Sequence, residues 1–138
     1  MTVSQSIINW LKEFSPDDMR HIDTDRMHGN VNYMLVKEPI TNVKRYISGA
    51  EIHKDFYQIV ARRDIQTNES CVENGSWMEQ LTGWIEEKNR KKEFPQVDGA
   101  DVKKIGVSSP FYMGDNVQNE ALYQMTIFIE YMKGAQTE

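Results

Sequence analysis

The sequence predicts an α+β fold in a single domain, residues 1–138, with a twisted, mostly antiparallel mixed sheet flanked by two main helices. Three observations lead to this prediction. Two segments carry apolar residues at helical spacing, while most other segments have the residue types and alternation of strands. The strands follow one another in runs and are not regularly separated by helices, which is typical of α+β rather than doubly wound α/β folds. A length of 138 residues is that of one ordinary domain.

The first helical segment lies at the N-terminus. Thr2 and Gln5 stand at the spacing of a capping box, and Ser15 precedes a proline, which disfavours the helical conformation. We therefore expect a helix over residues 3–14. Its apolar stripe consists of Val3, Ile7, Trp10, Leu11 and Phe14. The segment lacks the basic start of a signal peptide, so we do not expect it to be a targeting signal.

Strand patterns fill the next part of the chain. Residues 20–28 could hold a short strand, and residues 31–36 are strand-like and stop before a proline. Residues 41–48 and 52–63 are rich in β-branched and aromatic residues, and Gly49 between them supplies the turn of a hairpin. Charged residues run along both arms. We expect one face of this hairpin to be covered and the other to be in partial contact.

The second helical segment follows a turn-rich stretch, residues 68–76. Ser76 stands at the N-cap position, with Glu79 at capping-box spacing. Basic residues gather near Lys91, at the C-terminal end, where cations suit the helix dipole. The apolar stripe consists of Trp77, Leu81, Trp84 and Ile85. We expect this stripe to pack on the sheet.

The C-terminal third is expected to hold two strands separated by a loop. Residues 102–107 form a short strand and residues 108–116 the loop. Residues 121–132 show the clearest strand pattern in the chain. The apolar face of this strand consists of Tyr123, Met125, Ile127, Ile129 and Tyr131. A wholly apolar face is strongly specified for burial.

The sequence offers no catalytic, cofactor-binding or metal site. Asp23, Asp25 and His28 lack the other ligands of a calcium loop, and Cys71, the single cysteine, has no zinc-like spacing to a histidine. There is no phosphate-binding loop and no nucleophile elbow. No apolar run approaches the ~20 residues that span a bilayer. A net charge of -5 weighs against nucleic-acid binding. We expect no enzyme; the alternative is a catalytic cleft assembled from residues that are distant in sequence.

The charged hairpin and the aromatic loop are the candidate interaction surfaces. Phe111, Tyr112 and Met113 lie outside any periodic pattern. The loop either folds back on the core or presents these large side chains to a partner. The candidate contact residues of the two segments are Lys44, Arg45, His53, Lys54, Asp55, Phe111, Tyr112 and Met113.

Several motifs resemble those of one group of phage proteins. The turn Y-I-S-G-A leads into F-Y-Q-I-V-A-R, and W-M-E-Q-L-T-G-W-I-E and Y-Q-M-T-I-F-I-E-Y follow. Over about residues 3–133, the chain resembles the minor capsid proteins of tailed phages of Gram-positive bacteria and the tail terminators of long-tailed phages. The matching positions act as fold determinants and are Trp10, Gly49, Phe56, Trp77, Trp84 and Tyr131.

The resemblance implies a non-enzymatic virion protein, assembled in the cytoplasm of the host bacterium. Copies of it would form a ring, in this family a hexamer, that caps the tail tube and meets the head connector. No membrane and no sequence-specific nucleic acid would be involved, and DNA would pass through the lumen. The alternatives are another connector or minor capsid component, or a small cytoplasmic protein-binding module. A strict monomer would favour an adaptor or an enzyme over the phage role.

Overall fold

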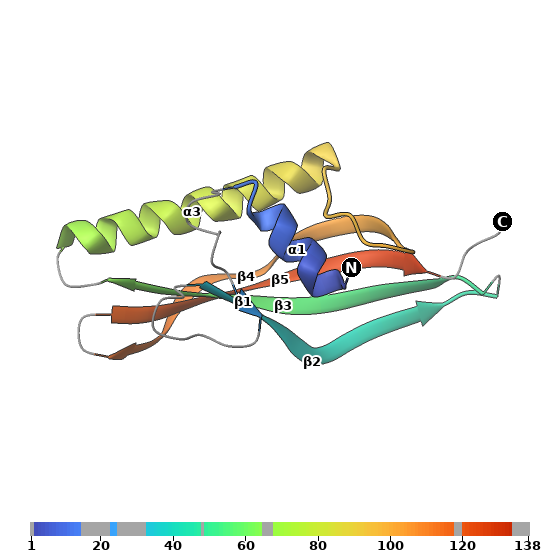
Figure 1. Ribbon diagram of the computed structural model, residues 1–138, viewed down its shortest axis with the longest axis horizontal. Coiled ribbons are helices and arrows are strands. Elements are labelled where there is room, and N and C mark those ends of the chain that lie inside the picture. Colours follow the sequence, from blue (N-terminus) through green and yellow to red (C-terminus); the bar gives the residue numbers. More distant parts are fainter. Residues whose placement is uncertain are drawn as a thin grey trace.

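A computed structural model describes residues 2–14, 23–24, 33–47, 49–64, 68–117 and 120–133. Within them, two helices lie on one face of a five-stranded sheet (Figure 1). The elements are α1 (Val3–Leu11), β1 (Asp23–Thr24), β2 (Tyr33–Arg45), β3 (Glu51–Asp64), α3 (Asn68–Lys91), β4 (Asp101–Val117) and β5 (Glu120–Lys133). This arrangement confirms the predicted α+β fold with two main helices.

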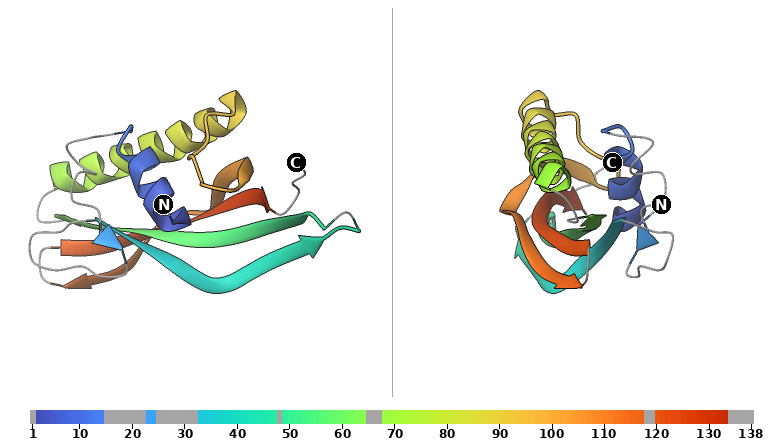
Figure 2. Two further views of the ribbon diagram at one scale, coloured as in Figure 1. Left: turned by 45° about the vertical axis from the view of Figure 1, so that its right-hand side comes forward. Right: turned by 90° about the vertical axis from the view of Figure 1, so that its left-hand side faces the viewer.

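The strand order in the sheet is β1-β2-β3-β5-β4. The short β1 pairs in parallel with β2, and the other neighbours pair antiparallel, so the sheet is mixed and mostly antiparallel, as predicted. The central pair is β3 and β5, in which Tyr57 lies opposite Ile127. Both views in Figure 2 show a strongly twisted sheet with α1 and α3 on the same side.

The core lies between the helices and the sheet. Alternate residues of β5 point into it, which confirms the predicted burial of that face. The largest fully buried side chains come from both layers and are Tyr57, Ile7, Leu11, Leu35, Ile59, Leu81, Ile85, Ile105, Met125, Ile127 and Ile129.

Helix α1 begins at its predicted cap. The Oγ1 atom of Thr2 accepts a hydrogen bond of 3.1 Å from the N–H of Gln5. The Gln5 side chain donates to Oδ1 of Asn9, at 3.3 Å, so only half of the capping box is made. The indole Nε1 of Trp10 donates to the carbonyl oxygen of Glu93 at 2.8 Å. This bond fastens α1 to the chain that follows α3.

Helix α3 begins at Asn68, so the prediction of a turn-rich stretch before a cap at Ser76 is wrong. Long-range contacts hold this part of the chain. Buried Asn74 accepts a bond of 2.6 Å from Nε of Arg63, which also donates to the Tyr33 hydroxyl at 2.8 Å. The same guanidinium lies 4.7 Å from the ring centre of Trp77. These contacts with β2 and β3 stabilise a helix in residues 68–76, despite the turn-like composition of that stretch.

The apolar stripe of α3 is divided between two partners. Leu81 and Ile85 are fully buried and belong to the core cluster that includes the inner face of β5. Trp84 is only partly buried and packs on α1. Its ring centre lies 4.6 Å from that of Trp10 and 5.6 Å from that of Phe14. The helix therefore joins α1 to the sheet.

Two expected chain breaks are absent. Strand β2 continues through Pro39, with a shift of register between Lys37 and Thr41. Strand β4 continues through the expected loop at residues 108–116, with four register shifts along its pairing with β5. Bulges of this kind add residues to a strand without ending it, and a proline such as Pro110 is tolerated in an edge strand.

Candidate interaction surfaces

The hairpin of β2 and β3 projects beyond the helices. In Figure 1 the turn between these strands lies at the right-hand end of the molecule, well past the last turn of α3. Three apolar side chains are exposed there: Val43 at 39%, Tyr46 at 45%, and Ile47, which is fully exposed. We call these three residues the hairpin patch. Large apolar side chains gathered at one projecting end are typical of a contact surface.

The turn has a defined geometry. The N–H of Gly49 donates to the carbonyl of Tyr46 at 3.0 Å, and the N–H of Tyr46 donates to the carbonyl of Ala50 at 3.0 Å. Gly49 has φ of 94°, in the left-handed region that favours glycine. This pattern matches a three-residue hairpin loop with a glycine bulge. The tip therefore presents Tyr46 and Ile47 in a fixed arrangement.

Polar side chains stiffen the root of the hairpin on its helix-facing side. Asp55 is 4% exposed, and its Oδ2 accepts a hydrogen bond of 2.7 Å from the hydroxyl of Tyr131. The ring of His53 stacks on that of Tyr131, with centres 5.3 Å apart and planes 8° from parallel. His53 Nε2 and Arg45 Nε each lie 2.9 Å from a carboxylate oxygen of Glu51. Both arms of the hairpin and strand β5 are joined by these contacts.

The pKa values of two groups respond to this arrangement. The hydrogen bond from Arg45, followed by that from His53, lowers the pKa of the Glu51 carboxyl group. Burial, followed by the hydrogen bond to Asp55, raises the pKa of the Tyr131 phenol.

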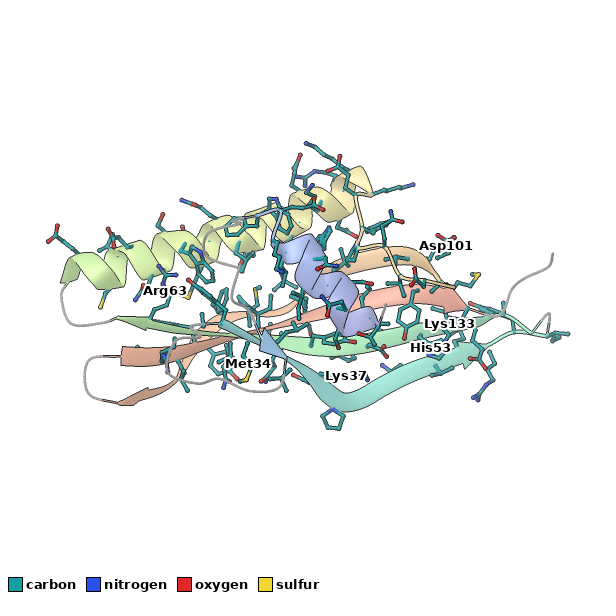
Figure 3. All side chains as sticks on the ribbon, viewed as in Figure 1. Met34, Lys37, His53, Arg63, Asp101 and Lys133 are labelled. Carbon is teal, nitrogen blue, oxygen red and sulfur yellow. The ribbon has the colours of Figure 1, made fainter. Side chains whose placement is uncertain are left out.

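Figure 3 shows His53 and Lys133 at the hairpin end of the sheet, whereas Arg63 and Met34 lie towards the other end.

The other side of the hairpin forms an open groove of about 360 Å³. Its lining combines apolar side chains such as Tyr46 and Ile52 with charged groups, among which the ammonium of Lys54 lies 3.7 Å from a carboxylate oxygen of Glu130. The same ammonium lies 4.6 Å from the ring centre of Phe128. The groove is lined by Asn42, Val43, Lys44, Tyr46, Ile52, Lys54 and Glu130.

A second exposed group lies on edge strand β4. Tyr112 is 49% exposed and Met113 is 47% exposed, and we call these two residues the β4 patch. The hydroxyl of Tyr112 donates to Oε1 of Gln124 at 2.7 Å. Phe111 points the other way and packs on Trp77, with ring centres 5.6 Å apart. Phe111 therefore folds back on the core, whereas Tyr112 and Met113 are exposed, and their contact with a partner stays a prediction.

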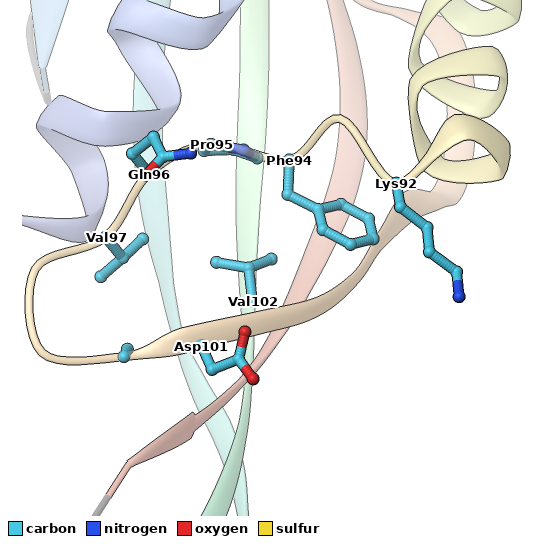
Figure 4. A pocket seen from close by; sticks show the side chains of 8 residues that line it. Lys92, Phe94, Pro95, Gln96, Val97, Asp101 and Val102 are labelled. Carbon is cyan, nitrogen blue, oxygen red and sulfur yellow. The ribbon is translucent and has the colours of Figure 1, made fainter.

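A small crevice of about 160 Å³ lies beside the connection from α3 to β4 (Figure 4). Helix α3 ends there with Lys92 in the left-handed conformation, at φ of 60°. The Lys92 N–H donates to the Asn89 carbonyl at 3.1 Å, and the Glu93 N–H donates to the Lys88 carbonyl at 2.9 Å, the pattern of a Schellman motif. The crevice is far smaller than the roughly 300 Å³ of a small-molecule pocket.

The eight candidate contact residues fall into three positions. Lys44 and Lys54 line the groove, and Tyr112 and Met113 form the β4 patch. The other four are engaged within the chain, and are Arg45, His53, Asp55 and Phe111. The four remaining candidates thus lie on two separate surfaces, the groove of the hairpin and the edge strand β4.

The sequence reasoning did not select the hairpin patch itself. Val43, Tyr46 and Ile47 were assigned to strands with one covered face. The available signal was the pair of adjacent large apolar residues, Tyr46 and Ile47, close to the turn glycine Gly49 and just past the last paired residue of β2. The tertiary structure decides whether a helix covers the end of the hairpin. The sequence alone therefore does not predict whether Val43, Tyr46 and Ile47 are exposed.

The part of the chain that the structure describes contains no group of three His, Cys, Asp or Glu side chains placed to hold a metal ion. Within the same residues, no helix is long and apolar enough to cross a membrane. Comparison with models of protein families gives no match, and comparison with curated proteins gives no relative.

Proposed function

We propose that the protein is a non-enzymatic structural subunit of a phage virion. It acts as a tail terminator, forming a ring that stops growth of the tail tube and joins the tail to the head. The motif resemblance over residues 3–133 supports this role. One structural observation carries it further: the hairpin patch and the β4 patch are different surfaces on opposite edges of the sheet.

A ring of identical subunits needs two such surfaces. Each subunit contacts the next through one patch and the previous one through another, and the contact repeats around an axis until the ring closes. The hairpin patch lies at one end of the sheet, and β4 runs from that end towards the other (Figure 1). Opposed positions of this kind suit a head-to-tail contact better than a two-fold one. The number of six subunits comes from the resemblance alone.

The charge of the chain suits the proposed lumen. A net charge of -5 would let DNA pass without being held by the ring. The partners would be other copies of the chain, the end of the tail tube and the head connector, and assembly would take place in the host cytoplasm. Ring interfaces of modest size would leave the ring itself unassembled in solution until the tube end brings the subunits together.

The decisive experiment is made in a phage that carries this gene. We expect its deletion to give filled heads without tails, or tails of uncontrolled length, in electron micrographs. A phage with Tyr46→Ser and Ile47→Ser should show the same defect, because the changes remove the apolar tip. The control is Val72→Ser, which removes an apolar side chain that is 64% exposed on α3. We expect it to leave the tails normal.

Two outcomes would redirect the proposal. Tails of normal length attached to heads in the deletion mutant would rule out the terminator role. Loss of heads altogether would move the protein to capsid assembly, the nearest alternative.

The purified variant with Tyr46→Ser and Ile47→Ser should unfold at the same urea concentration as the wild type, since exposed tip residues contribute little to stability. This measurement separates a lost contact from a lost fold.

A further inference from the structure

The two long edges of the sheet differ in how their backbone groups are protected. On edge strand β4, Oδ1 of Asn89 accepts a hydrogen bond of 3.1 Å from the N–H of Ile105. Pro110 has no N–H to offer, and four register shifts distort the strand. These are the usual devices that prevent an edge strand from pairing with another chain.

The outer edge of β2 lacks this protection near the hairpin. Among the described residues, β1 pairs only with Met34 and Leu35, so Thr41–Arg45 pairs with β3 on one side alone. The N–H of Tyr46 points inward, to the carbonyl of Ala50. Because backbone groups alternate in direction along an antiparallel strand, those of residues 41, 43 and 45 point outward. This edge offers a row of donors and acceptors.

We propose that this edge pairs antiparallel with the same edge of a second copy of the chain, about a two-fold axis beside Val43. The two sheets would then form one continuous sheet, with the helices of both copies on the same face. Both sides of this contact are the same segment, so Thr41–Arg45 must be complementary to itself.

The residues meet this requirement in the register centred on Val43. Val43 lies opposite its own copy and is covered by it, which removes one member of the hairpin patch from water. Lys44 lies opposite Asn42, and Arg45 lies opposite position 41, which is uncharged. The outward-pointing residues 41, 43 and 45 face one another, as the backbone pairing demands. No pair of like charges is directly opposed.

Other registers are disfavoured. A shift of two residues in one direction places Lys44 directly opposite the second Lys44, and like charges in that position are destabilising. A shift in the other direction places Arg45 opposite Pro39, which has no N–H to pair. The sequence of this edge therefore selects a single alignment.

This inference goes beyond the proposed function, because it concerns the free protein. The pairing covers part of the hairpin patch, so it would have to open before the hairpin meets a neighbour in the ring. Its tests use purified protein and no phage. A monomer in solution would overturn the pairing and leave the tail phenotype to decide the proposed function separately.

Cysteine cross-linking tests the alignment. Cys71 is exposed and is first replaced, as Cys71→Ser, to remove unrelated disulfides. In that background Val43→Cys places two thiols across the axis, since opposed residues in a hydrogen-bonded pair lie about 5.5 Å apart between Cα atoms, within disulfide range. Lys103→Cys, an exposed position on the β4 edge, is the matched control. We expect rapid disulfide dimers of the first variant only. Equal rates for both variants would overturn the proposal.

Sedimentation equilibrium tests the energetics. Asn42→Lys places a lysine of each copy opposite Lys44 of the other copy, which creates two like-charge pairs. We expect the change to weaken the dimer about tenfold at low salt. Gln80→Lys adds the same charge on the exposed face of α3 and should have no effect. Circular dichroism confirms folding of each variant. A wild-type protein that remains monomeric at high concentration, or equal weakening by both changes, would refute the pairing.

Discussion

The bond between Tyr131 and Asp55 provides a direct test of the hairpin root. Tyr131→Phe removes the hydroxyl that donates to Asp55 at 2.7 Å, and keeps the ring that stacks on His53. The change therefore isolates one hydrogen bond to a buried carboxylate. It does not create a cavity large enough to confuse the result.

The structure sets the expected magnitude. A hydrogen bond to a charged group contributes about 1.5–3 kcal/mol, and Asp55 is 4% exposed, so water cannot easily replace the lost donor. We expect Tyr131→Phe to lower the free energy of unfolding by about 2 kcal/mol at pH 7. Tyr123→Phe is the matched control. Tyr123 lies on the same face of β5 and is buried, and its hydroxyl makes no hydrogen bond to any residue that the structure describes.

Urea melts of the three proteins give the comparison. The control should lose less than about 0.5 kcal/mol, since it gives up no hydrogen bond. Equal losses in the two variants would refute the reasoning, because they would show that the Asp55 bond adds nothing to the burial of a tyrosine ring.

The pH dependence gives a second check with a definite sign. The raised pKa of Tyr131 means that the folded protein holds the phenol proton more tightly than the unfolded chain does. The stabilisation is complete below pH of about 10, the ordinary tyrosine value, and is lost above it by up to about 1.4 kcal/mol per pH unit. The difference in stability between wild type and Tyr131→Phe should therefore shrink as the pH rises above 10. A constant difference would contradict the raised pKa.

Four further substitutions test the architecture, each by a urea melt. Lys92→Gly should raise stability by roughly 0.5–1 kcal/mol, because glycine relieves the left-handed conformation, whereas Lys91→Gly, at the last residue of the helix, should lower it by up to about 1 kcal/mol. Trp84→Ala should cost about 3 kcal/mol, and a loss below 1 kcal/mol would mean that α1 and α3 do not pack through this ring. Asn89→Ala should cost about 1 kcal/mol and increase light scattering on storage, since it frees the N–H of Ile105 on the β4 edge.

Periodicity predicted the elements whose surroundings are regular. In β5 every second residue enters the core along the whole strand, so the pattern is uninterrupted. It failed in β4, where register shifts break the alternation and Pro110 is accommodated because the strand lies on an edge. It also failed at the start of α3, where the bond from Arg63 to Asn74 holds turn-like residues in a helix. Such long-range contacts leave no local signal.

The candidate interaction surfaces were only partly predicted, because contacts between residues distant in sequence decide which side chains are exposed. Residue types marked the hairpin and the segment after Pro110 as unusual, because charged residues run along both arms of the hairpin and the large side chains after Pro110 follow no periodic pattern. They did not reveal which side chains are already engaged. Asp55 is buried beside Tyr131 of β5, and Phe111 packs on Trp77 of α3, so both facts depend on elements that are distant in sequence.

The charges of the hairpin have a structural explanation that bears on the proposed role. Arg45 and His53 both bind Glu51, and Asp55 binds Tyr131 of the adjacent strand. These bonds fix a projecting element that would otherwise lose conformational freedom on binding, and ordering an interface before contact reduces that loss. The affinity of a hairpin contact should then come mainly from the apolar tip and not from the charged arms. In the proposed ring, removing Ile47 should therefore weaken assembly more than neutralising Lys44.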